Sequence, residues 1–196
     1  MFMGKKIPMI GFLLLIILLS GCTENTDDGN SGNTSDDASL IPDATLTPTP
    51  FPSNYSLDSM VNVEPLPNGY EILGILPISD YDEYSENIVD TREGAYRDPE
   101  NVDVFLDIIE LNSEQAAFDF ISNYKAQYVP LDVENRFTTI SFNEHSAERI
   151  IEYKYSSGDQ IPKYKIIWNQ GNIVFVVRSN SHLESSSFEL AKATGY

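Results

Sequence analysis

The 196-residue chain has few of the residues on which metal sites and disulfide frameworks depend. It contains one cysteine, two histidines and one tryptophan. A single cysteine excludes an intrachain disulfide and any site built from several cysteine ligands, and two histidines exclude a histidine-rich metal centre. Because no disulfide can form within the chain, the fold must depend on core packing, and 41% of the residues are hydrophobic.

Basic residues are also scarce. The chain has 12 Lys and Arg against 30 Asp and Glu, which gives a formal net charge of -18. Nucleic-acid binding needs a basic patch that displaces counterions from phosphates, so this composition predicts no nucleic-acid partner. The sequence also lacks a G-x-S-x-G nucleophile motif, an H-E-x-x-H zinc motif and a glycine-rich phosphate loop. These absences favour a protein without catalytic activity and without a cofactor.

The N-terminal residues are typical of an export signal. Lys5 and Lys6 precede an apolar run at residues 9–19, which is shorter than the roughly 20 residues that span a bilayer. The run ends in Leu-Ser-Gly-Cys at residues 19–22, which resembles the lipobox of prokaryotic lipoproteins. This resemblance implies that residues 1–21 are a cleaved signal peptide and that Cys22 carries a diacyl- or dialkylglycerol lipid. The alternative is an uncleaved N-terminal anchor.

Both alternatives place the rest of the chain on the outer side of the cell membrane. Lys5 and Lys6 are expected to stay on the cytoplasmic side, so the residues after Cys22 face outside the cytoplasm. Two lipid chains on Cys22 would make the anchoring stable. The sequence therefore predicts a lipid-anchored protein whose partner is the membrane through its anchor.

Residues 22–60 are predicted to form a disordered tether. This segment is acidic and rich in Thr-Pro, with little apolar surface to bury. Asn33 and Asn54 each begin an N-x-S/T triplet and are candidate glycosylation sites. An acidic chain with a Thr-Pro stalk is similar to archaeal cell-surface lipoproteins, and a bacterial exported lipoprotein is the alternative.

Residues 61–196 are predicted to form a single globular domain. Asn112 or Ser113 can cap a helix that Pro130 ends, and a second helix is expected over residues 183–194. Strands are expected at residues 70–78, 102–111, 137–142, 147–155, 164–168 and 173–178, with a shorter strand flanked by residues 88–89 and 95–97.

The order β-β-β-α-β-β-β-β-α predicts an α+β fold, a mostly antiparallel sheet that carries two helices. Residues 173–177 are apolar on both faces, so this strand is expected at the centre of the sheet with both faces covered. In element order alone, the domain resembles the PsbP/Mog1-like sandwich.

Candidate cation ligands occur in the acidic segment at residues 80–86. Asp80, Asp82 and Glu86 could bind Ca²⁺, which takes six to eight oxygen ligands. The spacing does not match an EF-hand loop, because Ser85 stands where glycine is required and Thr91 where glutamate is required. The alternative is a solvated acidic loop.

Four other residues are candidate ligand contacts on strands. Arg92 and Arg97 flank Tyr96 and could hold an anionic ligand, or they could pair with nearby carboxylates. Trp168 alternates with tyrosines of neighbouring strands, an arrangement that can stack on sugars but more commonly packs beneath a helix.

The two histidines are the remaining candidates for chemistry. His145 lies in a predicted turn and His182 just before the last helix, and either could act as a base or lie on the surface. We therefore expect a membrane-anchored extracytoplasmic lipoprotein that acts as a non-catalytic binding or interaction module at the cell surface, with a small ligand or a membrane complex as partner. The alternatives are a lipid-tethered hydrolase and a structural or divalent-cation-binding surface protein.

Overall fold

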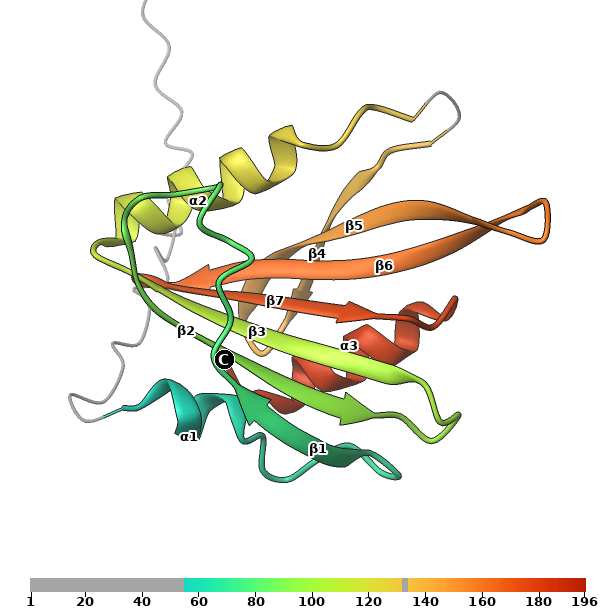
Figure 1. Ribbon diagram of the computed structural model, residues 1–196, viewed down its shortest axis with the longest axis horizontal. Coiled ribbons are helices and arrows are strands. Elements are labelled where there is room, and N and C mark those ends of the chain that lie inside the picture. Colours follow the sequence, from blue (N-terminus) through green and yellow to red (C-terminus); the bar gives the residue numbers. More distant parts are fainter. Residues whose placement is uncertain (1–54, 132–133) are drawn as a thin grey trace, which may run out of the picture. The chain divides into compact units, whose positions relative to one another are not determined.

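The computed structural model describes residues 55–131 and 134–196, which form the predicted α+β fold. The strands are β1 (Glu71–Leu76), β2 (Ile88–Arg97), β3 (Asp103–Leu111), β4 (Phe137–Phe142), β5 (His145–Ser156), β6 (Asp159–Gln170) and β7 (Ile173–Ser179). The helices are α1 (Leu57–Val61), α2 (Glu114–Ala126) and α3 (Glu184–Ala193). All strand pairs are antiparallel, and the sheet order is β1-β2-β3-β7-β6-β5-β4 (Figure 1).

The last strand, β7, lies at the centre of the sheet. It pairs with β3 on one side and β6 on the other, and so joins the meander β1-β2-β3 to the meander β4-β5-β6-β7. All its residues are buried except Arg178, which is partly exposed. The prediction of a central strand covered on both faces is confirmed.

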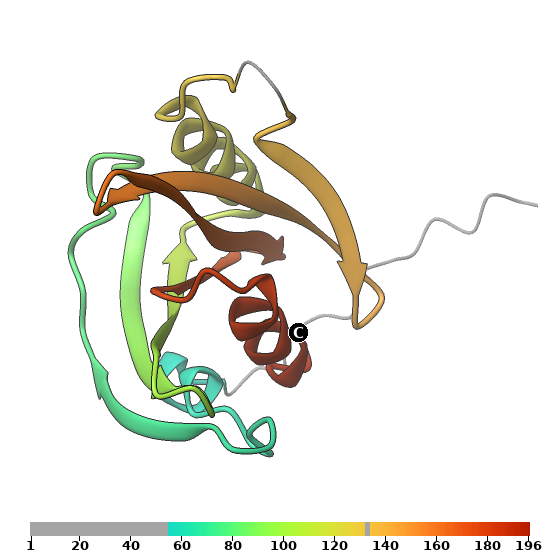
Figure 2. The same ribbon diagram turned by 90° about the vertical axis from the view of Figure 1, so that its right-hand side faces the viewer.

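Helices cover both faces of the sheet (Figure 2). On one face, α2 buries Ala117, Phe120 and Tyr124 against strand residues that include Ile109 and Val176. On the other face, α1 and α3 pack on a second core cluster, whose largest side chains are Trp168, Tyr96, Phe175 and Met60. Ser113 is the residue that caps α2, since its hydroxyl accepts from the backbone N–H of Ala116 at 3.2 Å.

The first four of the five residues of helix α1 fall in the segment predicted to be a disordered tether, residues 22–60. Ser56 caps it, and Leu57, Met60 and Val61 are buried in the core. The Tyr96 hydroxyl donates to the carbonyl oxygen of Val61. The described fold therefore has three helices instead of the two expected, and its packed region begins before Val61.

Two strand predictions were too short for physical reasons that the structure makes clear. Strand β2 runs without a break because its polar residues are paired; Arg92, for example, forms ion pairs with Asp58 and Asp90. Strand β6 contains Pro162, which cannot donate a ladder hydrogen bond. Pairing of β6 with β7 begins only at Lys165, so Pro162 lies where β6 has a neighbour on one side only.

Two glycines in neighbouring strands allow a matched test of this packing. A Cβ at Gly94 would lie 2.8 Å from Cε2 of Tyr96 and 3.0 Å from Cγ2 of Val61, whereas a Cβ at Gly74 meets nothing within 4 Å. Gly94→Ala is therefore expected to lower the free energy of unfolding by about 1–3 kcal/mol, through overpacking between β2 and α1. Gly74→Ala is the control and should leave it unchanged or slightly raised. Urea unfolding followed by Trp168 fluorescence measures both, and equal effects would contradict the packing described.

Candidate binding site

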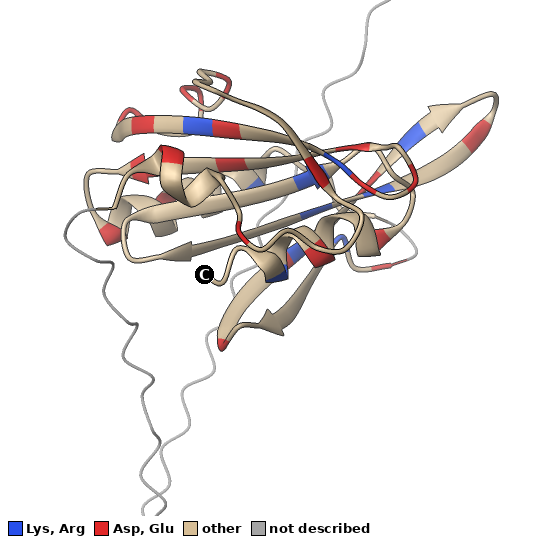
Figure 3. Cartoon of the chain, turned by 90° about the horizontal axis from the view of Figure 1, so that it is seen from below, with Lys and Arg blue, Asp and Glu red and all other residues tan. Residues whose placement is uncertain are grey.

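Four basic side chains line a cavity on the face of the sheet that α2 covers only in part. The cavity has a volume of about 250 Å³. We call it the basic cavity, and its lining residues are Phe105, Glu152, Lys154, Lys163, Lys165, Arg178, Ser179 and Asn180. Of the 12 basic residues in the chain, Lys5 and Lys6 precede Cys22, so four of the remaining ten lie at this cavity. Acidic residues, by contrast, are spread over strands, turns and helices (Figure 3).

The alternation of side chains along β5 and β6 brings these charges together. Residues two apart in a strand point to the same face, so Lys163 and Lys165 of β6 share a face, as do Glu152 and Lys154 of β5. Glu152 lies directly opposite Lys163 in the strand register. The hairpin therefore presents three ammonium groups and one carboxylate to the basic cavity.

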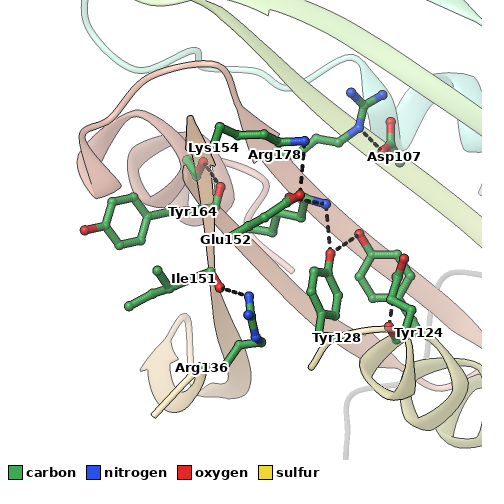
Figure 4. Close-up of polar contacts among 12 residues, drawn as sticks. Asp107, Tyr124, Tyr128, Arg136, Ile151, Glu152, Lys154, Tyr164 and Arg178 are labelled. Atoms are coloured by element: carbon green, nitrogen blue, oxygen red, sulfur yellow. Dashed lines mark hydrogen bonds and ion pairs between the residues drawn. The ribbon is translucent and has the colours of Figure 1, made fainter. Parts of the chain in front are cut away.

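Glu152 links two of the lysines (Figure 4). Its carboxylate lies 3.0 Å from Nζ of Lys154 and 3.1 Å from Nζ of Lys165. Burial acts against ionisation, but hydrogen bonds and charge from these two lysines outweigh it and lower the pKa of Glu152. Lys165 also donates to the hydroxyl of Tyr128 at 2.8 Å, which connects the site to the segment after α2.

Lys163 differs from its neighbours because its charge is not matched by a carboxylate. Its ammonium donates to the backbone carbonyl of Asn180, and among residues 55–131 and 134–196 it forms no ion pair. An ammonium group without a carboxylate partner attracts anions. Lys163 is therefore the lining residue best placed to contact an anionic ligand.

Arg178 forms the wall of the basic cavity and connects it to buried charges beneath. Its Nε donates to Oδ2 of Asp107 at 2.8 Å (Figure 4). Its Nη2 bonds to Glu93. The guanidinium lies over the ring of Phe105, 4.4 Å from the centroid. Oδ2 of Asp107 also accepts from the hydroxyl of Tyr81 at 2.5 Å. The side chain of Asp107 is completely buried, so Arg178 is its essential counter-ion.

Aromatic residues seal this cluster from solvent on the side of α2. Tyr81 packs against Phe120 and Tyr124, with ring centroids 5.8 Å and 6.1 Å away. Burial, followed by the charge of Asp107, raises the pKa of Tyr81 well above its usual value, so this phenol stays a neutral donor. Burial likewise raises the pKa of Tyr124.

The acidic segment proposed as a cation site has a structural role through its tyrosines. Asp80, Asp82 and Glu86 are exposed, while Tyr81 and Tyr84 anchor the loop against α2. Within the described ranges, no three acidic, histidine or cysteine side chains group in a way that could hold a metal ion. The structure does not gather the three carboxylates into a site.

The other candidate ligand contacts on strands form ion pairs or core contacts within the domain. Arg92 pairs with Asp58 at 2.7 Å, and Arg97 pairs with Asp103 at 2.9 Å. Tyr96 is fully buried, and Trp168 is 1% exposed, stacked on Phe175 beneath the helices. These residues do not form one surface.

The two histidines lie apart, near opposite ends of α3. Asn143, in the turn before His145, donates to the carbonyl oxygen of Lys192 near the C-terminal end of this helix, whereas His182 precedes its N-terminus. A helix of ten residues is about 15 Å long. His145 is half-buried and His182 exposed, and neither lines the basic cavity.

Cys22, Asn33 and Asn54 lie outside the described residues, so the predicted lipid attachment and glycosylation sites stay predictions. Within residues 55–131 and 134–196, no helix has the length and apolar character needed to cross a bilayer. Comparison of the chain with family models, curated proteins and solved structures finds no match.

The sequence interpretation missed the residues that build the basic cavity. The alternation of side chains along β3 puts Asp107 on the face opposite Val104, Leu106 and Ile108, and the structure shows that Asp107 is buried there and bonds to Tyr81 of the loop before β2. One signal was available: between Asp159 and Glu184 the sequence has no acidic residue but contains Lys163, Lys165 and Arg178. In a chain this acidic, such a segment indicates a local positive surface.

Proposed function

We propose that the protein is a lipid-anchored, extracytoplasmic binding module without catalytic activity, and that the basic cavity is its site for an anionic ligand. The observation that carries this proposal is the gathering of four of the domain's ten basic side chains at one cavity. Residues 61–196 contain 23 acidic residues and have a net charge of -13. Against this acidic background, the residues that line the cavity include four basic side chains and one acidic side chain, Glu152.

The electrostatics of the cavity favour a small oxyanion group, such as a sulfate, phosphate or carboxylate. Lysine ammonium groups act as point charges that can approach an oxyanion from several directions. Arg178 is already paired with two carboxyl groups, and Lys154 and Lys165 share the carboxylate of Glu152. Lys163 is therefore the main contact for the anion. The remaining acidic surface would repel large polyanions and direct a small anion toward the cavity.

The predicted tether would determine how far from the membrane the domain binds its ligand. The part of this predicted tether that precedes the packed region, residues 23–54, is 32 residues long and as a flexible chain would reach roughly 30 Å from the membrane. The domain would thus sample the space outside the membrane while its lipid keeps it attached. An anionic ligand in that space, or an anionic group on a membrane complex, is the partner this arrangement fits.

Chemical-shift mapping tests the proposal. The full-length ¹⁵N-labelled chain in non-ionic micelles is titrated with sodium sulfate, with sodium chloride as the control at equal ionic strength. Sulfate is expected to shift the amides of residues at the basic cavity, such as Phe105, Lys163 and Asn180, and to leave the surface of α3 unchanged. Shifts spread evenly over all exposed basic residues would show that the cavity is not a site.

A further inference from the structure

A fully buried carboxyl group and a largely buried one face each other behind the wall of the basic cavity. Glu93 of β2 and Asp107 of β3 are direct partners in the antiparallel register. The side chain of Asp107 is fully buried, and that of Glu93 is 14% exposed. Like charges directly opposite each other in a sheet are destabilising, and burial strengthens the repulsion. One charge, that of Arg178, serves both carboxyl groups.

The hydrogen bonds of Asp107 are incomplete when both groups are ionised. Its Oδ2 accepts from Tyr81 and Arg178, but its buried Oδ1 has no donor in the described part of the chain. Buried polar atoms in folded proteins nearly always have a partner. Glu93 is the cross-strand partner of Asp107 and bonds to the same Arg178 side chain, so a proton on Glu93 would supply a donor beside this carboxyl group.

We infer that Glu93 and Asp107 hold one proton between them, with the Glu93 carboxyl group donating to Oδ1 of Asp107. The pair then carries a single negative charge, which Arg178 balances. Burial and the neighbouring Asp107 charge raise the pKa of Glu93, with Arg178 opposing them, in agreement with this arrangement. The pair is thus a buried proton-binding site built across two central strands.

The other groups that face the pair do not change this charge balance. Tyr81 comes from the loop before β2 and Tyr124 from α2, and burial raises the pKa of each, so both are neutral. Asp80, on the same loop as Tyr81, is exposed and adds only a further negative charge. Among these groups, Arg178 is the one that favours ionisation of Glu93.

The shared proton should also affect anion binding at the basic cavity, and this consequence rests on the proposed function. Arg178 lines the cavity and contacts both carboxyl groups. Loss of the shared proton places a second negative charge behind Arg178 and should weaken anion binding. By linkage, a bound anion should favour the protonated pair to the same extent.

Glutamine at position 93 mimics the protonated carboxyl group. Whether Glu93→Gln raises or lowers the stability of the protein therefore tests the inference. A raised pKa in the folded state means that wild-type stability falls as pH rises through that pKa, and this fall should be absent in the variant. The urea midpoint of the full-length variant at pH 7, followed by Trp168 fluorescence, should equal or exceed that of the wild type. The difference in urea midpoint between Glu93→Gln and the wild type should disappear near pH 4.

Glu152→Gln is the matched control on the same face of the sheet. The pKa of Glu152 is lowered, so its ionised form stabilises the fold at neutral pH and this contribution is lost as pH falls. Its variant should therefore have a lower midpoint than the wild type at pH 7. A lower midpoint for Glu93→Gln as well would show that Glu93 acts as an ionised partner of Arg178, and would overturn the inference.

A measurement on the wild type decides the matter even if a variant does not fold. In a ¹³C carboxyl NMR titration of the full-length chain, the Glu93 signal should keep its protonated shift above the pH at which exposed glutamates lose it. An ordinary glutamate titration at Glu93 would overturn the inference. No ligand is present in this experiment, so its outcome is independent of the proposed anion site.

Discussion

Replacing Arg178 with leucine is expected to lower the free energy of unfolding by about 3–5 kcal/mol, because it leaves a buried carboxylate without its counter-ion. The Nε of Arg178 bonds to the fully buried Asp107, and its Nη2 bonds to Glu93. Leucine fills part of the volume but provides neither charge nor donors. The loss should be smaller at low pH, where protonation removes the uncompensated charge, and urea unfolding followed by Trp168 fluorescence measures it.

Two further variants show whether the geometry or the charge of Arg178 is responsible for its contribution to stability. Arg178→Lys keeps the charge but cannot reproduce the planar fork that reaches two carboxyl groups, so we expect an intermediate loss. Lys154→Met removes a basic side chain that is 61% exposed at the same cavity, and it should change stability by less than about 0.5 kcal/mol. If Arg178→Leu were no more harmful than Lys154→Met, Asp107 could not be a buried ion that depends on Arg178.

Replacing Cys22 with serine is expected to remove the protein from the membrane or to leave its signal uncleaved. The thiol of Cys22 is the predicted site of lipid attachment, and serine lacks this nucleophile. Each buried methylene of a lipid contributes about 0.8 kcal/mol to membrane affinity, so losing two chains removes the anchor entirely. Fractionation of cells that express the full-length variant, with gel mobility as the measure of processing, gives the result.

Ser20→Ala is the control for this experiment. It keeps a small residue before Cys22 and should be processed and anchored like the wild type. A Cys22→Ser variant that is processed and anchored normally would show that the lipobox interpretation is wrong. Electrostatics cannot replace the lipid, because after removal of Lys5 and Lys6 the chain has ten basic and 30 acidic residues, and anionic headgroups would repel it.

Much of the fold could be predicted because its signals are local. Residues 137–142 form strand β4 as expected, since a short β-rich run needs no distant partner to be recognised. The apolar run at residues 173–177 indicated a central strand, and its burial on both faces follows directly. Helix α1 was missed because it has only five residues, and its stability comes from contacts with distant strands, such as the hydrogen bond from Tyr96.

The candidate site could not be predicted to the same degree, because its contacts are long-range. Glu93, Asp107 and Arg178 lie on three strands that are adjacent only after β7 inserts beside β3. The alternation of side chains along β3 places Asp107 on the face opposite Val104, Leu106 and Ile108. The alternation cannot reveal that the loop carrying Tyr81 covers this face. The sequence therefore drew attention to half-buried charges that pair within the fold, such as Arg92 and Arg97, and not to the buried Asp107.

The affinity of sulfate for lysine variants of the full-length chain tests the central claim most directly. Lys163→Gln removes the unmatched charge at the basic cavity, and Lys192→Gln removes a lysine that pairs with Glu189 on α3. Two charges 4 Å apart in water attract by about 1 kcal/mol, so Lys163→Gln should weaken binding about fivefold, and Lys192→Gln should leave it unchanged. Equal affinities for the wild type and both variants would contradict the assignment of the basic cavity as the binding site.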